Sequence, residues 1–207
     1  MTLPREPRLH AVPIAELRPT QITVGMREVE GKCKQWRSHP DSKKPDFLGR
    51  HMIPVVLGPK ERYYIIDHHH LSLALYKEGV KHIAAAVVAD LRRLDSDAFF
   101  IYLDNRGWMH PYDADGRRRA FEDLPKRLVD LVDDPYRSLA GELRRRGGFA
   151  KDTTPFSEFL WADFLRRRIK RKLVLQDFAM TLRAAMQLAK SEEANFLPGW
   201  CGPIRSE

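Results

Sequence analysis

The sequence is poor in cysteine and has no long apolar run. Its 207 residues include only two cysteines, Cys33 and Cys201, and neither belongs to a Cys-x-x-Cys pair or a cysteine–histidine ligand pattern. A disulfide framework and a structural zinc finger are therefore not indicated, and we expect a cytoplasmic protein. No stretch approaches the roughly 18 apolar residues that span a bilayer, and residues 1–5 lack the apolar segment of a signal peptide. We expect neither feature.

Acidic residues are outnumbered by basic ones. Lys and Arg total 36, Asp and Glu total 28, and the formal net charge is +8. This balance favours anionic partners such as nucleotides, other phosphorylated ligands or nucleic acid. Residues 1–100 carry 16 basic and 12 acidic residues and residues 101–207 carry 20 and 16, so each part has a charge of +4 and there is no separate basic arm.

The apolar pattern of the first 95 residues predicts a mixture of strands and helices. The strands are expected at residues 9–14, 53–57, 63–66 and 83–88, and the helices at residues 26–37 and 71–78. The short polar connection 58–62 should join the two middle strands as a hairpin, and Gly79 should cap the helix before it. Residues 38–50, which contain two prolines, are expected to form a loop.

Beyond residue 95 the pattern becomes helical. Helices are expected at residues 96–103, 116–132 with a break at Pro125, 136–146, 155–172 and 173–190. With 43% hydrophobic residues the chain can bury a substantial core. We predict an α+β module at residues 1–95, followed by a helical extension at residues 96–207 that packs on it. The aromatic residues Trp36, Trp108, Phe159 and Trp161 are expected in hydrophobic cores.

The most informative segment is Asp67-His68-His69-His70, which follows the apolar strand 63–66 and leads into a helix. The first N–H groups of a helix are free and partly positive, so they can hold a phosphate. Imidazole and carboxylate together can instead bind Mn, Fe or Zn. Because side chains alternate along a strand, Asp67 with His69, or His68 with His70, would then converge. We favour phosphate.

The order of several motifs resembles the ParB/sulfiredoxin superfamily, and within it the putative ParB-like nuclease family. The motifs lie at residues 17–21, 54–56, 64–70, 134–140 and 158–162, and the resemblance covers about residues 8–172. It implies a small mixed sheet with helices and a helical C-terminal half, and a strand-to-helix junction that binds nucleotide phosphates.

The resemblance assigns expected roles to the junction residues. His68 replaces the usual glycine after the strand, and His70 occupies the basic position that contacts phosphate. His69 stands where sulfiredoxins have their reactive cysteine, so reduction of sulfinic acids is not expected. Leu71 replaces a common arginine, which removes one phosphate ligand.

Charge and proton transfer must then come from other residues. Gln21 lies near the position of a glutamate in serine kinases of this fold, and an amide cannot act as a general base. Gln21 is therefore expected to bind the ligand, while Glu28 or Glu30 on the following helix is a candidate base. The residues expected to supply positive charge to the same ligand are Lys32, Lys34, Arg50 and His51.

Two classes of function remain open. The first is a nucleotide- or phosphate-binding protein, acting as a phosphoester hydrolase or phosphotransferase with Asp67, His69 and Glu28 as catalytic residues and a nucleotide with Mg or Mn as cofactor. The second is a noncatalytic DNA-associated or effector module that uses the arginine runs 117–119, 144–146 and 166–168.

Overall fold

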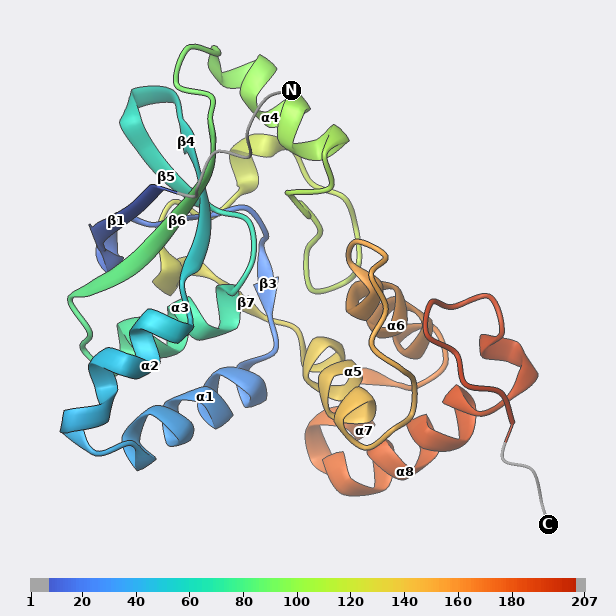
Figure 1. The fold of residues 1–207 in the computed structure, drawn as a ribbon. Coiled ribbons are helices and arrows are strands. Elements are labelled where there is room, and N and C mark those ends of the chain that lie inside the picture. The colour runs from blue at the N-terminus through green and yellow to red at the C-terminus, as the bar shows by residue number, and fades with distance from the viewer. Residues whose placement is uncertain (1–7, 204–207) are drawn as a thin grey trace, which may run out of the picture.

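The computed structural model describes residues 8–203 and confirms an α+β fold with a mixed sheet (Figure 1). Five strands pair in the order β1-β6-β4-β5-β2, and β3 pairs with β7 separately. The strands are β1 (Arg8–Pro13), β2 (Arg18–Pro19), β3 (Thr23–Val24), β4 (Ile53–Gly58), β5 (Arg62–Ile65), β6 (His82–Asp90) and β7 (Val132–Asp133). Residues 1–5, on which the expectation about a signal peptide rests, lie outside the described residues.

The pairing confirms the predicted hairpin. Strands β4 and β5 are antiparallel neighbours, whereas β2 runs parallel to β5 and β6 runs parallel to β4. The connection between β4 and β5 turns tightly, with both Lys60 and Glu61 at positive φ. The sheet therefore places the end of β5, where the histidine segment begins, beside the short strand β2.

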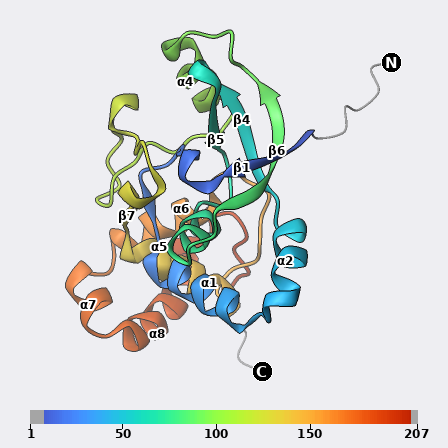
Figure 2. The same cartoon turned by 90° about the vertical axis from the view of Figure 1, so that its left-hand side faces the viewer.

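Eight helices occur within the described residues: α1 (Met26–Ser38), α2 (Lys44–Arg50), α3 (His69–Lys77), α4 (Ser96–Asn105), α5 (Pro135–Arg145), α6 (Ser157–Arg166), α7 (Arg171–Gln176) and α8 (Phe178–Ala189). Helices α5 to α8 lie together on one side, away from the five-stranded sheet (Figure 1). Helix α1 packs on α3 beneath the sheet (Figure 2). Among residues 8–203, no helix has the length and apolar character needed to cross a membrane.

Two predictions from local pattern were wrong. Residues 44–50 form α2 and not a loop, because Pro45 sits in the first helical turn, where its missing N–H is not needed, and Phe47 is buried against Trp36. Residues 116–132 form no α-helix. The N–H of Val132 there donates to the carbonyl of Ile22 at 3.0 Å, so pairing with a distant segment replaces helical hydrogen bonds.

The boundaries of three other helices also differ from the prediction. Helix α3 begins at His69, two residues earlier than expected, and Gly79 follows it at a φ of +76°. Helix α6 begins only at Ser157 because Phe156 adopts a left-handed conformation. The expected helix 173–190 is divided at Asp177, whose carboxylate accepts a hydrogen bond from the N–H of Met180 at 2.9 Å and caps α8.

Buried apolar side chains form three clusters. One lies between the sheet and helices α3 and α1, a second lies within α5 to α8, and a third lies where α4 covers the other face of the sheet. Trp36 and Trp161 belong to the first two clusters, as expected. The third cluster joins Val56 and Tyr64 to Phe99 and Leu103, and so crosses residue 95. The division at residue 95 stays a prediction.

The start of α1 is fixed by side chains of β7 and α5. The N–H of Met26 donates to Oδ1 of Asp133 at 2.9 Å, and the N–H of Arg27 donates to Oγ of Ser138 at 3.3 Å. These bonds satisfy two of the N–H groups that a helix start leaves free. A Cβ on Gly25 would lie 2.7 Å from both the backbone nitrogen and the hydroxyl of Ser138, so only glycine permits this approach.

We therefore expect Gly25→Ala to destabilise the protein by about 1–3 kcal/mol, the usual cost of overpacking a close contact. Gly31→Ala is the matched control, because Gly31 lies in the same helix with nothing within 4 Å of an added Cβ. It should stabilise by about 0.5–1 kcal/mol through helix propensity. Urea denaturation measures both free energies of unfolding, and equal effects of the two substitutions would contradict the proposed contact.

Candidate functional site

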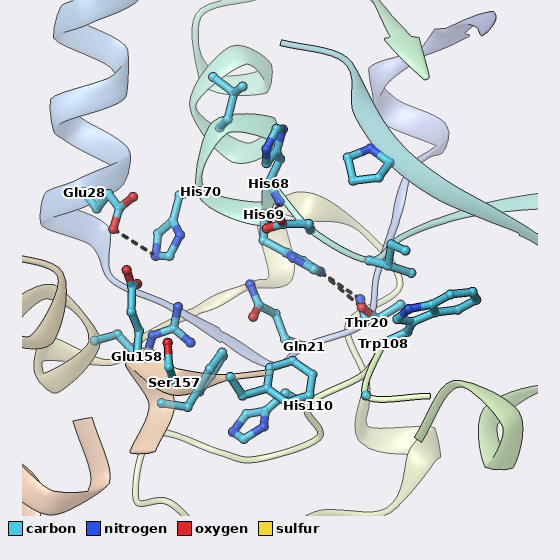
Figure 3. Close-up of a pocket in the computed structure, with 18 of the residues that line it drawn as sticks. Thr20, Gln21, Glu28, His68, His69, His70, Trp108, His110, Ser157 and Glu158 are labelled. Carbon is cyan, nitrogen blue, oxygen red and sulfur yellow. Dashed lines mark hydrogen bonds and ion pairs between the residues drawn. The ribbon is translucent and has the colours of Figure 1, made fainter. Parts of the chain in front are cut away.

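A cavity of about 640 Å³ lies between the start of α3 and the helical half (Figure 3). Residues 67–71 form part of its wall, and α1 contributes Glu28 and Lys32. Across from them, α5 and the segment that enters α6 contribute side chains that include Arg137 and Glu158. Parts of the chain more than 100 residues apart therefore meet at one cavity.

The turn between β5 and α3 contains an unusual backbone conformation. His68 precedes the helix with φ 62° and ψ 27°, a left-handed conformation that costs a non-glycine residue about 1–2 kcal/mol. The carboxylate Oδ1 of Asp67 accepts a hydrogen bond from the His68 N–H at 2.6 Å. This conformation explains why glycine suits the position, and such strain gathers at functional sites.

The next two histidines hold the main chain. Nε2 of His69 accepts a hydrogen bond from the N–H of Thr20 at 3.1 Å, and Nε2 of His70 accepts one from the N–H of Gly25 at 2.9 Å. Burial lowers the pKa of both rings well below 6.5, and the nearby charge of Arg137 lowers each pKa further. Both rings are therefore neutral at pH 7 with the proton on Nδ1, and only that N–H remains to meet a ligand.

Glu28 lies at the edge of the cavity, close to two cationic side chains and to the neutral ring of His70. Its carboxylate oxygens lie 3.7 Å from Nζ of Lys32, 3.9 Å from Nε2 of His70 and 3.9 Å from Nη1 of Arg145. Gln21 is buried and lies between the histidines and the residues of the helical half (Figure 3). Gln21 can donate and accept hydrogen bonds there, whereas Glu28 can accept a proton.

The far wall is aromatic as well as charged. The ring of His110 stacks on Tyr112, with centroids 4.4 Å apart, and lies 3.7 Å from the ring of Phe159. Burial, assisted by Arg137, lowers the pKa of His110 to about 3. The prediction that Phe159 belongs to a hydrophobic core was wrong, since its half-buried ring lines the cavity. Trp108 packs on the core around α4, as expected, and also lines the cavity.

The structure brings most of the predicted site residues together. Those that line the cavity are Gln21, Glu28, Lys32, His51, Asp67, His68, His69 and His70. Glu30, Lys34 and Arg50 were also expected there, but their side chains are exposed and are absent from the described lining. The catalytic and binding roles of these residues stay predictions.

The converging pairs expected for a metal site are not formed. Within residues 8–203, no three His, Cys, Asp or Glu side chains are placed to hold a metal ion. The alternation rule does not apply because α3 begins at His69, and residues two apart on a helix face different directions. His69 and His70 accordingly point at Thr20 and Gly25.

Sequence reasoning missed the residues beyond α4 that line the cavity. These include His110, Arg137, Arg144, Lys151, Asp152, Ser157 and Glu158. Arg137 lies within the motif 134–140, which was used only for the resemblance. The signal that could have found it is the position of Arg137 between two apolar residues, Tyr136 and Leu139, that are both buried. Charged side chains are rarely buried without a partner, so such a position indicates a partner or a ligand.

Comparison with known proteins shows the family and supports the fold. The family described as putative ParB-like nuclease matches residues 10–167. The crystal structure of protein Atu1540 from Agrobacterium tumefaciens is similar with a TM-score of 0.91 and 56% sequence identity, covering 96% of this chain and 98% of that one. A search of curated proteins found no match.

The buried neutral histidines predict an acid-sensitive fold. Below about pH 6.5 the unfolded chain protonates His69, His70 and His110 more readily than the folded chain does, so the free energy of unfolding should fall as pH decreases, in the case of His110 down to about pH 3. Each ring should contribute about 1.4 kcal/mol per pH unit within this range.

Denaturation at several pH values measures this slope. His110→Phe should reduce it by about 1.4 kcal/mol per pH unit, whereas Tyr112→Phe, in the same stack, should leave it unchanged. An unaltered slope in His110→Phe would show that His110 is protonated in the folded protein.

Proposed function

We propose that this chain, which belongs to the putative ParB-like nuclease family, binds the phosphoryl group of a nucleotide or another phosphorylated ligand in its cavity. We propose further that it acts on a phosphoester bond of that ligand. The observation that carries the proposal is that residues 67–71, which include the start of α3 at His69, form one wall of an open cavity. The free N–H groups of that helix start and its positive dipole end favour an anion.

The charges of the lining support the proposal through their arrangement and not their sum. Four basic and four acidic residues line the cavity, so the formal charge of the lining is zero. The basic residues are Lys32, Arg137, Arg144 and Lys151, and the acidic residues are Glu28, Asp67, Asp152 and Glu158. All four carboxylates already lie next to donors of the protein, including Glu28, which lies 3.7 Å from Nζ of Lys32. Asp67 accepts from the N–H of His68, Asp152 from that of Thr154 at 2.7 Å, and Glu158 lies 2.6 Å from Arg144.

A hydrolytic reaction needs a base beside the bound phosphoryl group. Asp67 is exposed at the cavity, and its second oxygen, Oδ2, remains free to accept a proton from water. Glu28 is the second candidate, from the side of α1. His69 contributes a hydrogen bond from Nδ1 and not proton abstraction, since its Nε2 accepts from the main chain. A divalent ion such as Mg or Mn, when bound, would neutralise charge on the phosphoryl oxygens.

The alternative, a noncatalytic DNA-associated module, has weaker support. The three arginine runs on which it rests are extensively ion-paired, as in Arg118–Asp104, Arg119–Asp123, Arg145–Glu142, Arg146–Glu142, Arg167–Asp163 and Arg168–Glu193. Pairing with carboxylates reduces the charge available to neutralise DNA phosphates.

Ligand binding can be tested with two lysines of α1. Lys32 lines the cavity and Lys34, two residues later, is exposed and outside the lining. Nucleotides, offered with and without Mg or Mn, should raise the melting temperature of the wild-type protein by mass action. Lys32→Ala should weaken the apparent affinity about tenfold, the loss of roughly 1.4 kcal/mol, and Lys34→Ala should not. Absence of a thermal shift with every nucleotide would refute the proposal.

Catalysis can be tested with Asp67→Asn. The amide oxygen can still accept the hydrogen bond from His68, so the fold should persist, but the base is lost. Hydrolysis of a phosphodiester substrate should fall about a hundredfold or more. Asp177→Asn is the control, because Asp177 also accepts a main-chain N–H but caps α8, away from the cavity. Equal rates in Asp67→Asn and wild type would exclude Asp67 as the base.

A further inference from the structure

Arg137 is a buried cation, and two of its donors have no acceptor among the residues that the structure describes. Its side chain lies on α5, is 5% exposed and lines the cavity. Nε and Nη1 are both buried and have no hydrogen-bond acceptor among the described residues. No described carboxylate lies within the 4.0 Å that defines an ion pair with this guanidinium. Buried arginines are normally paired, so this arrangement requires an explanation.

The nearby carboxylates do not supply the missing partner. Burial lowers the pKa of the Arg137 guanidinium, and Glu158, Asp134 and Glu28 oppose that effect from a distance. Asp134 already binds Arg166 at 2.5 Å, and Glu158 lies 2.6 Å from Arg144. Arginine nevertheless stays charged in proteins, so a positive charge persists at this wall with two donors unsatisfied. Such a group costs several kcal/mol of folding stability.

The orientation of Arg137 suits an oxyanion. Its Cζ lies 3.3 Å from the centroid of the Phe159 ring, so one face of the guanidinium is covered and its plane is fixed. A guanidinium held in this way offers two parallel N–H groups to two oxygens of one carboxylate or phosphoryl group. The charge of Arg137 acts on His69, His70 and His110, which places it among the residues around the same cavity.

We propose that Arg137 is the oxyanion receptor of the cavity, and that its guanidinium donates hydrogen bonds to the oxygens of the ligand. The proposal deepens the proposed function and rests on it for the identity of the anion as a phosphoryl group. Arg137 comes from α5, whereas the junction 67–71 comes from the sheet, so the bound anion is contacted by both halves of the molecule.

A substitution that removes the charge but keeps the volume gives the direct test. We expect Arg137→Met to melt at the same temperature as wild type or higher in chloride, because an unpaired buried charge has been removed. Inorganic phosphate, compared with chloride at equal ionic strength, should stabilise the wild type and not this variant. The phosphate affinity of Arg137→Met should be at least tenfold lower than that of the wild type.

Arg27→Met is the matched control, since Arg27 also stacks on a phenylalanine, with its Cζ 4.1 Å from the centroid of Phe178, but is exposed and lies outside the cavity. It should keep the full response to phosphate. If Arg137→Met fails to fold, Arg137→Lys keeps the charge without the planar pair of donors. We then expect weaker phosphate binding, and an affinity equal to wild type overturns the proposal.

The possible outcomes separate this inference from the proposed function. Phosphate stabilisation that persists in Arg137→Met but is lost in Lys32→Ala overturns the inference and leaves the function standing. Stabilisation by acetate and not phosphate, if it depends on Arg137, supports the receptor and contradicts a phosphorylated ligand. A protein that responds to neither anion overturns the inference.

Discussion

Two neutral imidazoles that accept main-chain N–H groups are the constraint on which the site depends. His69 holds Thr20 and His70 holds Gly25, so the segment from β2 to α1 is tied to the first turn of α3 at two points. Gln21 lies between these points and is thereby fixed in the cavity. Protonation of either ring would convert an acceptor into a donor and break the tie. The site therefore requires that both rings stay buried and uncharged.

The second constraint concerns the position of α5. The close approach of Gly25 to Ser138, together with the caps that Asp133 and Ser138 provide for α1, fixes this helix against the sheet module. One consequence is that Arg137, next to Ser138, lies at the wall of the cavity, and two of its donors have no hydrogen-bond acceptor among the described residues. Ser138 makes contacts that stabilise the fold, whereas the buried charge of Arg137, one residue earlier, reduces the stability of the fold. A destabilising side chain of this kind is expected where it is retained for binding.

Local pattern was sufficient for elements whose hydrogen bonds are local or whose partners are close in sequence. The β4–β5 hairpin and helices α1 and α3 were predicted with errors of a few residues, and the same pattern identified the junction at Asp67. The pattern failed for residues 116–132, whose main chain bonds to Ile22 instead of its own helix. It also missed Arg137 and His110, because the meeting of these residues with residues 67–71 depends on contacts between distant parts of the chain. The histidines were recognised, but not that their Nε2 atoms are occupied by the backbone.

The most direct test of this account is a crystal structure of the protein grown with a phosphorylated ligand, with inorganic phosphate as the simplest case. The account predicts an anion in the cavity that contacts both the first N–H groups of α3 and the guanidinium of Arg137, with the His69–Thr20 and His70–Gly25 hydrogen bonds intact. An anion bound elsewhere, with the cavity filled by water and Arg137 turned toward a carboxylate of the protein, would contradict it.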